Sequence, residues 1–228
     1  KFLISISCNQ PSGSHIFKSL SVINNQEWMT TIEKIKQLAE AERDNCISLR
    51  RHLHAHPELS FHEVETSDYI RKRLVSMGFD SVSTIGDTGV VATIQGKRQG
   101  KTILLRADTD ALPIQETTGL LFQSTVEGVM HACGHDAHTA MLMTAAKILL
   151  DIRSDLAGTV KILFQPAEEI PPGGAVKMIA AGVLENPKVD TAIGQHVMPR
   201  LPVGKVGIRS GKFMASSDNF ALTVHGKG

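Results

Sequence analysis

Residues 101–110 read KTILLRADTD, an apolar run that ends abruptly in two aspartates. Runs of this kind alternate with helical patterns along the chain, and strands that alternate with helices form βαβ units. We therefore predict an α/β fold with a mostly parallel sheet and helices on both of its faces. The predicted strands cover residues 88–94, 101–108, 159–164 and 190–197, and the predicted helices among them cover residues 139–152 and 175–184.

Two further helices are predicted upstream of these strands. Apolar residues recur at helical spacing from residue 30 to about residue 54. The second helix is predicted between residues 60 and 78, where Ser60 and Glu63 have the spacing of a capping box and Gly78 is a typical stop.

Composition limits the classes of function. The chain has 228 residues, 42% hydrophobic and 21% charged, with a formal net charge of +1. This composition lacks the basic field of a nucleic-acid-binding domain, and no apolar run reaches the roughly 18 residues that span a bilayer. We expect neither nucleic acid nor membrane as a partner. Cys8, Cys46 and Cys133 are odd in number and far apart, which argues against a disulfide framework and for a reducing, cytoplasmic location.

Polar side chains gather where the predicted strands end. Asp108 and Asp110 follow the strand at 101–108, Glu168 and Glu169 follow the strand at 159–164, and His196 lies near the end of the last strand. In open α/β sheets, functional groups collect at the carboxyl ends of the strands. We expect one crevice to hold these residues.

The stretch MHACGHDAHTAM, residues 130–141, adds Cys133, His135, Asp136 and His138 to that crevice. An ordinary turn before a helix is the alternative explanation for each of these residues alone. Together, thiolate, imidazole and carboxylate are ligands that zinc and its neighbours prefer, and Gly134 permits a tight turn that directs Cys133 and His135 to one centre. The pattern predicts a mixed, catalytic metal site, with Asp136, His138 or Asp108 orienting the ligands.

The adjacent pair Glu168 and Glu169 is a second signal. Two neighbouring carboxylates repel each other, and a bound cation offsets this repulsion while leaving one carboxylate free for proton transfer. A metal lowers the pKa of bound water from about 15.7 to about 7, and a nearby glutamate can pass its proton to a leaving amine. The alternative explanation is that the two carboxylates stand at the N-terminus of a helix, where the helix dipole favours negative charge.

The run RRHLHAHPELSFHE, residues 50–63, contains four histidines. His52 and His56 are four residues apart near the end of a helix, where histidine suits the helix dipole without binding a metal. We favour a structural role for this run, and we assign no role to His225.

In order, the motifs RRHLHAHPELSFHE, LLRADTDALPI, MHACGHDAHTAM, ILFQPAEE and GQHV resemble the M20 metallopeptidase family, specifically its amidohydrolase branch of N-acyl amino acid, hippurate and auxin-conjugate hydrolases. The resemblance runs from about Arg50 to Gly228. It implies a catalytic α/β domain with an inserted α+β lid domain that often dimerises, and two neighbouring divalent metals that serve amide cleavage.

The resemblance also implies roles for individual residues. Glu168 matches the general base, and Asp108 matches an aspartate that orients the metal site. Arg106 stands where the wider superfamily has a histidine ligand. The matching metal ligands are Cys133, His135, Glu169 and His196.

The predicted domain organisation rests on this resemblance and on the weak periodicity of residues 1–28. Residues 1–28 are predicted to be a tail or an extension, residues 29–212 an incomplete catalytic metal-binding domain, and residues 213–228 the beginning of the lid and dimerisation domain. The ending GKG looks like the start of a lid motif, and the resemblance therefore implies that the sequence is truncated relative to the family. The branch usually has a glycine run after the glutamate pair, whereas this chain reads IPPGGA, which predicts a stiffer loop.

The leading hypothesis is a metal-dependent amidohydrolase that acts on small N-acyl amino acids with two ions of zinc, manganese, cobalt or nickel, as a homodimer or homotetramer through the lid. One alternative is a dipeptidase or carboxypeptidase that shares the same site. Another is a metal-binding fragment without catalysis.

Overall fold

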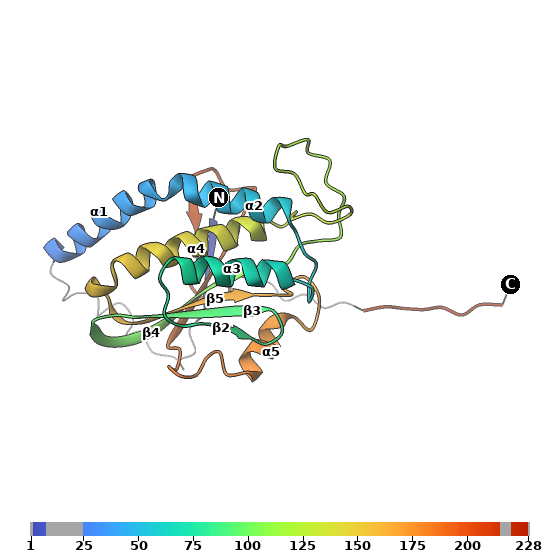
Figure 1. Cartoon of the computed structure of the whole chain (residues 1–228). Helices are drawn as coiled ribbons and strands as arrows, with labels where there is room; N and C mark the ends of the chain where they lie inside the picture. The colour runs from blue at the N-terminus through green and yellow to red at the C-terminus, as the bar shows by residue number, and fades with distance from the viewer. Residues whose placement is uncertain (1, 8–24, 215–219, 228) are drawn as a thin grey trace.

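The computed structural model describes residues 2–7, 25–214 and 220–227. Its centre is a seven-stranded sheet in the order β2-β3-β5-β4-β6-β1-β7 (Figure 1). The strands are β1 (Phe2–Ser7), β2 (Val82–Ile85), β3 (Gly89–Gln95), β4 (Arg98–Asp108), β5 (Ala157–Gln165), β6 (Thr191–Val197) and β7 (Val206–Gly207).

The middle of the sheet is parallel. Strand β4 pairs in parallel with β5 on one side and β6 on the other, and helices connect these strands in the chain. The hairpin β2–β3 is antiparallel because its turn is too short for a crossover, and β3 and β1 pair antiparallel with β5 and β6. The predicted α/β class is confirmed, with antiparallel strands flanking the parallel centre.

Helices cover both faces of the sheet, as predicted. The helices are α1 (Asn25–Ala41), α2 (Arg43–Ala55), α3 (Val64–Ser76), α4 (His135–Asp151) and α5 (Gly174–Ala180), with a short 3₁₀ turn at Arg153–Asp155. Figure 1 shows α3 and α4 on one side of the sheet and α5 on the other.

The core lies between α2, α3, α4 and the sheet. Leu49, Ile70 and Met143 from the three helices pack with Ile162 and Phe164 of β5, and all five are at most 1% exposed. Burying a side chain of this size contributes roughly 1.5–3 kcal/mol. This packing fixes α4 against β4 and β5, and so fixes the start of α4 at the carboxyl edge of the sheet.

The upstream helices differ from the prediction in detail. The single helix expected over residues 30–54 is divided into two helices at Glu42, a turn residue whose ψ of 0° departs from the regular helical value. The next helix begins at Val64 instead of residue 60, and it ends near Gly78 as predicted, with φ +95° at that glycine.

The predicted capping box does not form. Glu63 is the N-cap residue of α3, but its side chain does not cap the helix. The Glu58 carboxylate takes that role and accepts hydrogen bonds from the amides of Glu65 and Thr66 at 3.2 and 2.7 Å. Ser60 and Glu63 contact the candidate site instead, as described below.

The two ends of the described chain have different environments. Within residues 1–28, predicted as a tail or an extension, the structure places Phe2–Ser7 in the sheet and begins α1 at Asn25. Residues 220–227, in the predicted lid segment, have no regular structure, are exposed and extend away from the body (Figure 1). The domain boundaries at residues 28 and 212 stay predictions.

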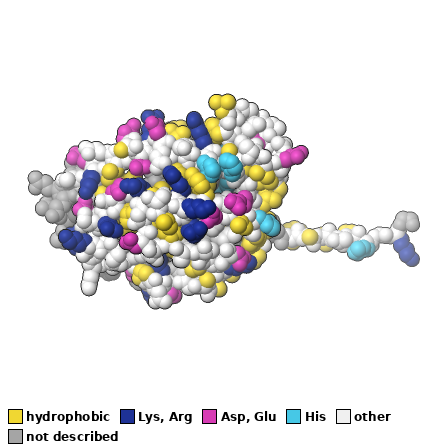
Figure 2. Space-filling model, viewed as in Figure 1, with side chains coloured by type: hydrophobic (Ala, Val, Ile, Leu, Met, Phe, Trp, Pro, Cys, Tyr) yellow, Lys and Arg dark blue, Asp and Glu magenta, His cyan; other side chains and the backbone are white. Residues whose placement is uncertain are grey.

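The surface carries mixed charge. Figure 2 shows basic and acidic side chains interspersed over one face of the molecule. Among the described residues, no helix is both long and apolar enough to cross a bilayer.

Candidate metal centre

The carboxyl ends of β4, β5 and β6 meet the first turn of α4 at one edge of the sheet. Donor atoms there form three groups, and within each group every atom lies within 4.8 Å of the others. The groups are Cys133, His135 and His196; Asp108, His135 and His138; and His135, Glu168 and Glu169. All six predicted site residues are therefore brought together, and His135 lies at the centre because it belongs to every group.

Cys133 and His196 face each other across the site. The Sγ atom of Cys133 lies 3.3 Å from Nε2 of His196, while Nδ1 of His196 donates to the carbonyl of Val197 at 2.6 Å. Hydrogen bonds with His135 and His196 lower the pKa of the Cys133 thiol. The Cys133 hydrogen bond also raises the pKa of His196. The thiol is thus poised to ionise, and the Nε2 atom of His196 points toward it.

Gly134 makes this arrangement possible, as the sequence predicted. Its φ of +87° lies in the left-handed region, and a Cβ atom there would meet Cγ2 of Val197 at 2.4 Å. A larger residue would push the start of α4 away from β6 and separate Cys133 from His196.

The side chain of His135 is fully buried, and one of its two ring nitrogens is held by a hydrogen bond. Its Nδ1 atom lies 3.1 Å from Oδ1 of Asp110, and its Nε2 atom lies 3.6 Å from an oxygen of Asp108 and 3.6 Å from Oε1 of Glu169. Burial lowers the pKa of His135, but the hydrogen bond with Asp110, the nearby Cys133 thiol and the charge of Asp108 raise it to about 11. This site strongly favours positive charge at the ring.

Two buried atoms of the cluster have no hydrogen-bond partner within the described structure: Nε2 of His135 and Oε1 of Glu169. Leaving such groups unsatisfied costs about 1–3 kcal/mol each. A divalent cation between them would satisfy both, and Cys133 and His196 would complete a sulfur, nitrogen and oxygen set that suits zinc and its neighbours. The residues present fit a transition metal.

His138 contacts this set with both of its ring nitrogens occupied. The amide of Val197 donates to Nε2 of His138 at 2.8 Å, so that nitrogen carries no proton. Its Nδ1–H therefore donates to Oδ1 of Asp108 at 2.5 Å. Burial lowers the pKa of His138 and favours this neutral form. His138 thus connects Asp108 to the backbone next to His196.

Asp108 is held from both sides. Its second oxygen accepts a hydrogen bond from Arg106 at 2.8 Å, and Arg106 also donates to Gln165 at 2.9 Å. Burial acts to raise the pKa of Asp108, but the His138 hydrogen bond and the charges of Arg106 and His135 lower it well below its usual range. Asp108 stays ionised beside His135, while the permanently charged Arg106 guanidinium cannot ligate a cation.

Glu168 differs from its neighbour Glu169. Its side chain reaches solvent, but partial desolvation of the carboxylate and the negative charges of Asp108 and Glu169 raise its pKa. A carboxylate with a raised pKa beside a metal site holds a proton more readily and can accept and return one during a reaction.

Asp110 was noted in the sequence but not assigned a site role. Its Oδ1 atom holds His135, while its Oδ2 atom accepts hydrogen bonds from the amide of Glu169 at 3.0 Å and from Ser60 at 2.6 Å. The signal was available, because Asp110 lies just beyond the end of β4, two residues after Asp108, where functional groups of α/β sheets collect.

Asp136 lies on a separate network that faces α2. Its Oδ2 atom lies 2.7 Å from Nδ1 of His54 and 2.8 Å from Nε of Arg50. His54 is buried, and its other nitrogen lies 3.2 Å from Glu116. Of the three candidates for orienting the ligands, Asp108 and His138 lie among the candidate donor atoms, whereas Asp136 faces α2.

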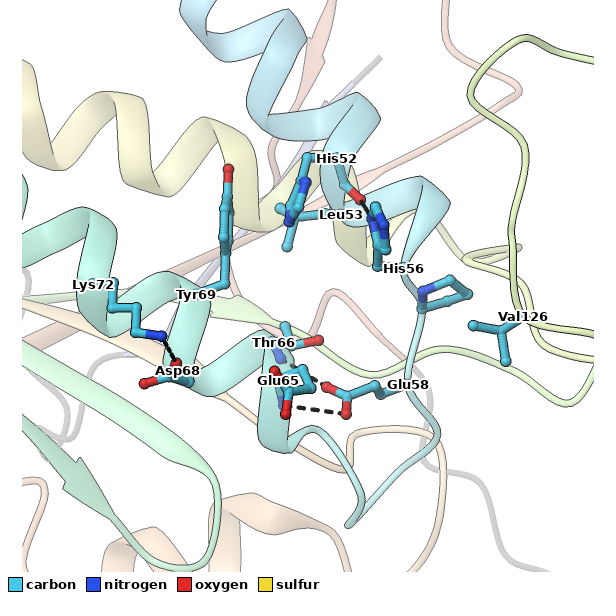
Figure 3. Close-up of a pocket in the computed structure, with 11 residues that line it drawn as sticks. His52, Leu53, His56, Glu58, Glu65, Thr66, Asp68, Tyr69, Lys72 and Val126 are labelled. Atoms are coloured by element: carbon cyan, nitrogen blue, oxygen red, sulfur yellow. Dashed lines mark hydrogen bonds and ion pairs between the residues drawn. The ribbon is translucent and has the colours of Figure 1, made fainter.

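Two histidines of the predicted structural run, His52 and His56, line a separate pocket of about 470 Å³ between α2 and α3 (Figure 3). The His52 ring stacks on Tyr69 with centroids 4.1 Å apart, and Nδ1 of His56 lies 2.7 Å from the carbonyl of His52. None of the six site residues lines this pocket. These contacts fit the structural interpretation.

The model of Peptidase family M20/M25/M40 matches residues 104–226. That span contains the ends of β4, β5 and β6, the start of α4 and all six site residues. The chain belongs to the M20 peptidase family. The resemblance found in the sequence is confirmed.

Relatives within the M20 family are closely similar. The chain is 47% identical over 198 residues to an N-acyl-L-amino acid amidohydrolase of Geobacillus stearothermophilus, covering 87% of this chain and 53% of the relative. It is 50% identical over 190 residues to an N-acetylcysteine deacetylase of Bacillus subtilis, covering 83% and 49%. The chain therefore spans about half the length of these curated relatives.

A solved M20 structure is also similar. The Bacillus subtilis YXEP protein, described as a dinuclear metal binding peptidase, shares 47% identity and a TM-score of 0.69. The match covers 75% of this chain and 48% of that protein.

Proposed function

We propose that the protein is a metal-dependent amidohydrolase that cleaves the amide bond of N-acyl amino acids or similar conjugates. The observation that carries this proposal is the convergence of Cys133, His135, Glu169 and His196, with the exposed Glu168 beside them. The names of the two bacterial relatives support the substrate class.

The proposed cofactor is a pair of divalent ions of zinc, manganese, cobalt or nickel. When bound, such ions polarise a carbonyl group and lower the pKa of water. Cys133, His135, Glu169 and His196 would hold them, and the thiolate favours zinc among these metals. The description of the similar YXEP protein as dinuclear supports two ions.

Glu168 is the proposed general base. Its raised pKa suits a group that removes a proton from the attacking water and delivers it to the leaving amine. Its exposure leaves a path for the substrate. Asp108 and His138 hold the backbone beside His196 and keep its Nε2 atom directed at the site.

The test is hydrolysis by metal-reconstituted protein of N-acetyl amino acids compared with dipeptides. We expect faster turnover of the N-acyl substrates, loss of turnover with a chelator, and recovery on adding metal. Preferred cleavage of dipeptides would favour the dipeptidase alternative, and turnover that survives complete metal removal would refute the proposal.

The role of Glu168 is tested separately. Glu168→Gln should lower kcat by at least about 10²-fold, because it removes the proton acceptor while keeping the size of the side chain. Metal content, measured by atomic absorption, should stay at the wild-type value. Retained turnover would remove Glu168 from this role.

Two further features belong to the proposal. We expect a homodimer or homotetramer through the second domain, measurable by light scattering. We also expect a cytoplasmic location, which the free thiols of Cys46 and Cys133 support because a reducing compartment preserves them.

A further inference from the structure

Glu63 is a buried carboxylate that its own helix does not use. It is 1% exposed and stands at the N-cap of α3, yet it makes no capping hydrogen bond. Its Oε1 atom instead accepts a hydrogen bond from the amide of Ala167 at 2.7 Å, across 104 residues of sequence. Its Oε2 atom accepts a hydrogen bond from the hydroxyl of Thr88 at 3.0 Å.

Ala167 is an unusual partner. It is fully buried and has φ +48°, a left-handed conformation that a residue with a Cβ atom adopts only when its surroundings enforce it. Its carbonyl accepts a hydrogen bond from the amide of Gly174 at 2.9 Å, which closes the loop. Both polar groups of Ala167 are thus fixed, and the next residue in the chain is Glu168.

A second buried carboxylate holds the backbone on the other side of Glu168. Asp110 accepts the hydrogen bond from the amide of Glu169 and is itself held by Ser60. The amides before and after Glu168 are therefore each bound by a carboxylate. The residues that hold this arrangement, Ser60 and Glu63, come from the same short turn before α3.

The electrostatics of Glu63 indicate that this contact has a cost. Burial raises the pKa of Glu63, against the lowering effect of the hydrogen bonds that it accepts. None of the ion pairs between described residues includes it. A buried carboxylate without a cationic partner is unfavourable unless hydrogen bonds compensate, and these donors are neutral.

We propose that Glu63 is a positioning residue for the glutamate pair: by holding the amide of Ala167, it directs Glu169 to the metal donors and Glu168 to the substrate side. This inference rests on the proposed function for the role of Glu168, but its contribution to metal binding is independent of substrate. The conformation of one backbone residue thereby sets the direction of two side chains.

The test compares three substitutions at one position. Glu63→Gln keeps an oxygen that can accept from Ala167, and its amide can donate to Thr88. Glu63→Leu has similar size without an acceptor, and Glu63→Asp keeps the charge but is one methylene shorter. Thr88→Val serves as the matched control, because it removes a contact to Glu63 that does not touch the loop.

Metal binding is the first measurement. Co²⁺ is titrated into the metal-free protein, and the absorption band from thiolate to cobalt reports coordination by Cys133. We expect the dissociation constant to rise about 10- to 100-fold for Glu63→Leu, as for other residues that orient ligands. We expect it to stay within about 3-fold of wild type for Glu63→Gln and Thr88→Val, on the same scale.

Hydrogen exchange and turnover complete the test. The Ala167 amide of the metal-free protein should exchange at least about 10-fold faster in Glu63→Leu, because its bond to a buried acceptor is gone. With saturating metal, kcat should fall about 10- to 100-fold while KM changes little, because misplacing a reacting group costs rate more than substrate binding.

Two results would overturn the inference. One is a Glu63→Leu protein with lower melting temperature but wild-type cobalt affinity and spectrum, which would assign Glu63 a structural role only. The other is a Glu63→Gln protein as impaired as Glu63→Leu. If Glu63→Leu does not fold, Glu63→Asp takes its place, with an expected loss of about 10-fold in cobalt affinity and wild-type affinity as the contrary result.

Failure of the proposed function gives a different pattern. A wild-type protein that binds Co²⁺ through Cys133 but hydrolyses no N-acyl amino acid would refute the amidohydrolase proposal. The cobalt and exchange measurements would still decide the role of Glu63.

Discussion

The segments 50–63 and 130–141 are both rich in histidine, and the structure uses them differently. In segment 50–63, His52 stacks on Tyr69 at the wall of a surface pocket, and His56 bonds to the backbone of its own helix. In segment 130–141, His135 is fully buried with one nitrogen held by a carboxylate and the other without a partner. A histidine is a ligand candidate when one ring nitrogen is held by a hydrogen bond and the other faces further donor atoms. The number of histidines in a segment does not reveal this arrangement.

The largest difference between the two segments is expected at His135. His135→Ala should weaken binding of Zn²⁺ or Co²⁺ by at least about 10³-fold, because it removes a donor that belongs to every group of the site. Calorimetric titration of the metal-free protein measures this. The double variant His52→Ala/His56→Ala is the matched control and should bind metal like wild type. Equal losses in both proteins would mean that the two segments do not differ in the way described.

A smaller effect is expected at His138, which lies in the same segment but has both ring nitrogens occupied. His138→Ala should lower metal affinity about 10- to 100-fold, because Asp108 and the backbone beside His196 lose their common partner. The number of ions bound per chain should not change. Loss of one bound ion in this variant would make His138 a ligand and overturn its assigned tautomer.

His54 is the buried histidine of segment 50–63 and tests whether burial alone makes a histidine important for metal binding. It lies between Asp136 and Glu116 and does not face the candidate metal donors. His54→Phe should cost about 3 kcal/mol of unfolding free energy near pH 6, since it removes one partner of a buried charged network. Metal affinity should change less than about 3-fold, because the network lies outside the ligand set. Urea unfolding of the metal-free protein provides the first number.

The pH dependence of that cost has a definite sign. The Asp136 hydrogen bond raises the pKa of His54 above its ordinary value of 6.5, so the stabilisation is complete below pH 6.5 and declines as pH rises through the raised pKa. The same bond lowers the pKa of Asp136 against the effect of burial, so stability is also lost as pH falls through the carboxylate range. The difference between wild type and His54→Phe should peak between roughly pH 5 and pH 6.5. A difference that grows toward about pH 9 would contradict a charged His54.

The smallest effect is expected at His52. Burial lowers the pKa of His52, so the neutral ring packs against Tyr69. His52→Ala should reduce the unfolding free energy by about 0.5–1.5 kcal/mol, the range for an aromatic pair. Thermal unfolding at two pH values on either side of neutrality measures it. A loss of unfolding free energy above about 3 kcal/mol would show that His52 contributes more to stability than a single aromatic pair.

The alternation of apolar runs and helical patterns was enough to predict the α/β class. Thiolate, imidazole and carboxylate at strand ends also indicated a metal centre, because parallel strands bring their carboxyl ends to one edge. Local patterns were less reliable for backbone detail: Ser60 and Glu63 have capping-box spacing, yet both serve contacts that lie 50 and 104 residues away.

By itself, the sequence identified candidate metal-binding side chains and predicted that the ends of the strands and the start of a helix bring them to one edge of the sheet. Only the tertiary structure decided that both ring nitrogens of His138 are occupied while Nε2 of His135 is not, that Asp136 faces α2, and that Glu63 holds Ala167. The physical reason is that these roles depend on hydrogen bonds between residues distant in sequence. Which nitrogen or oxygen stays free is fixed by packing, and a pattern of neighbouring residues does not contain that information.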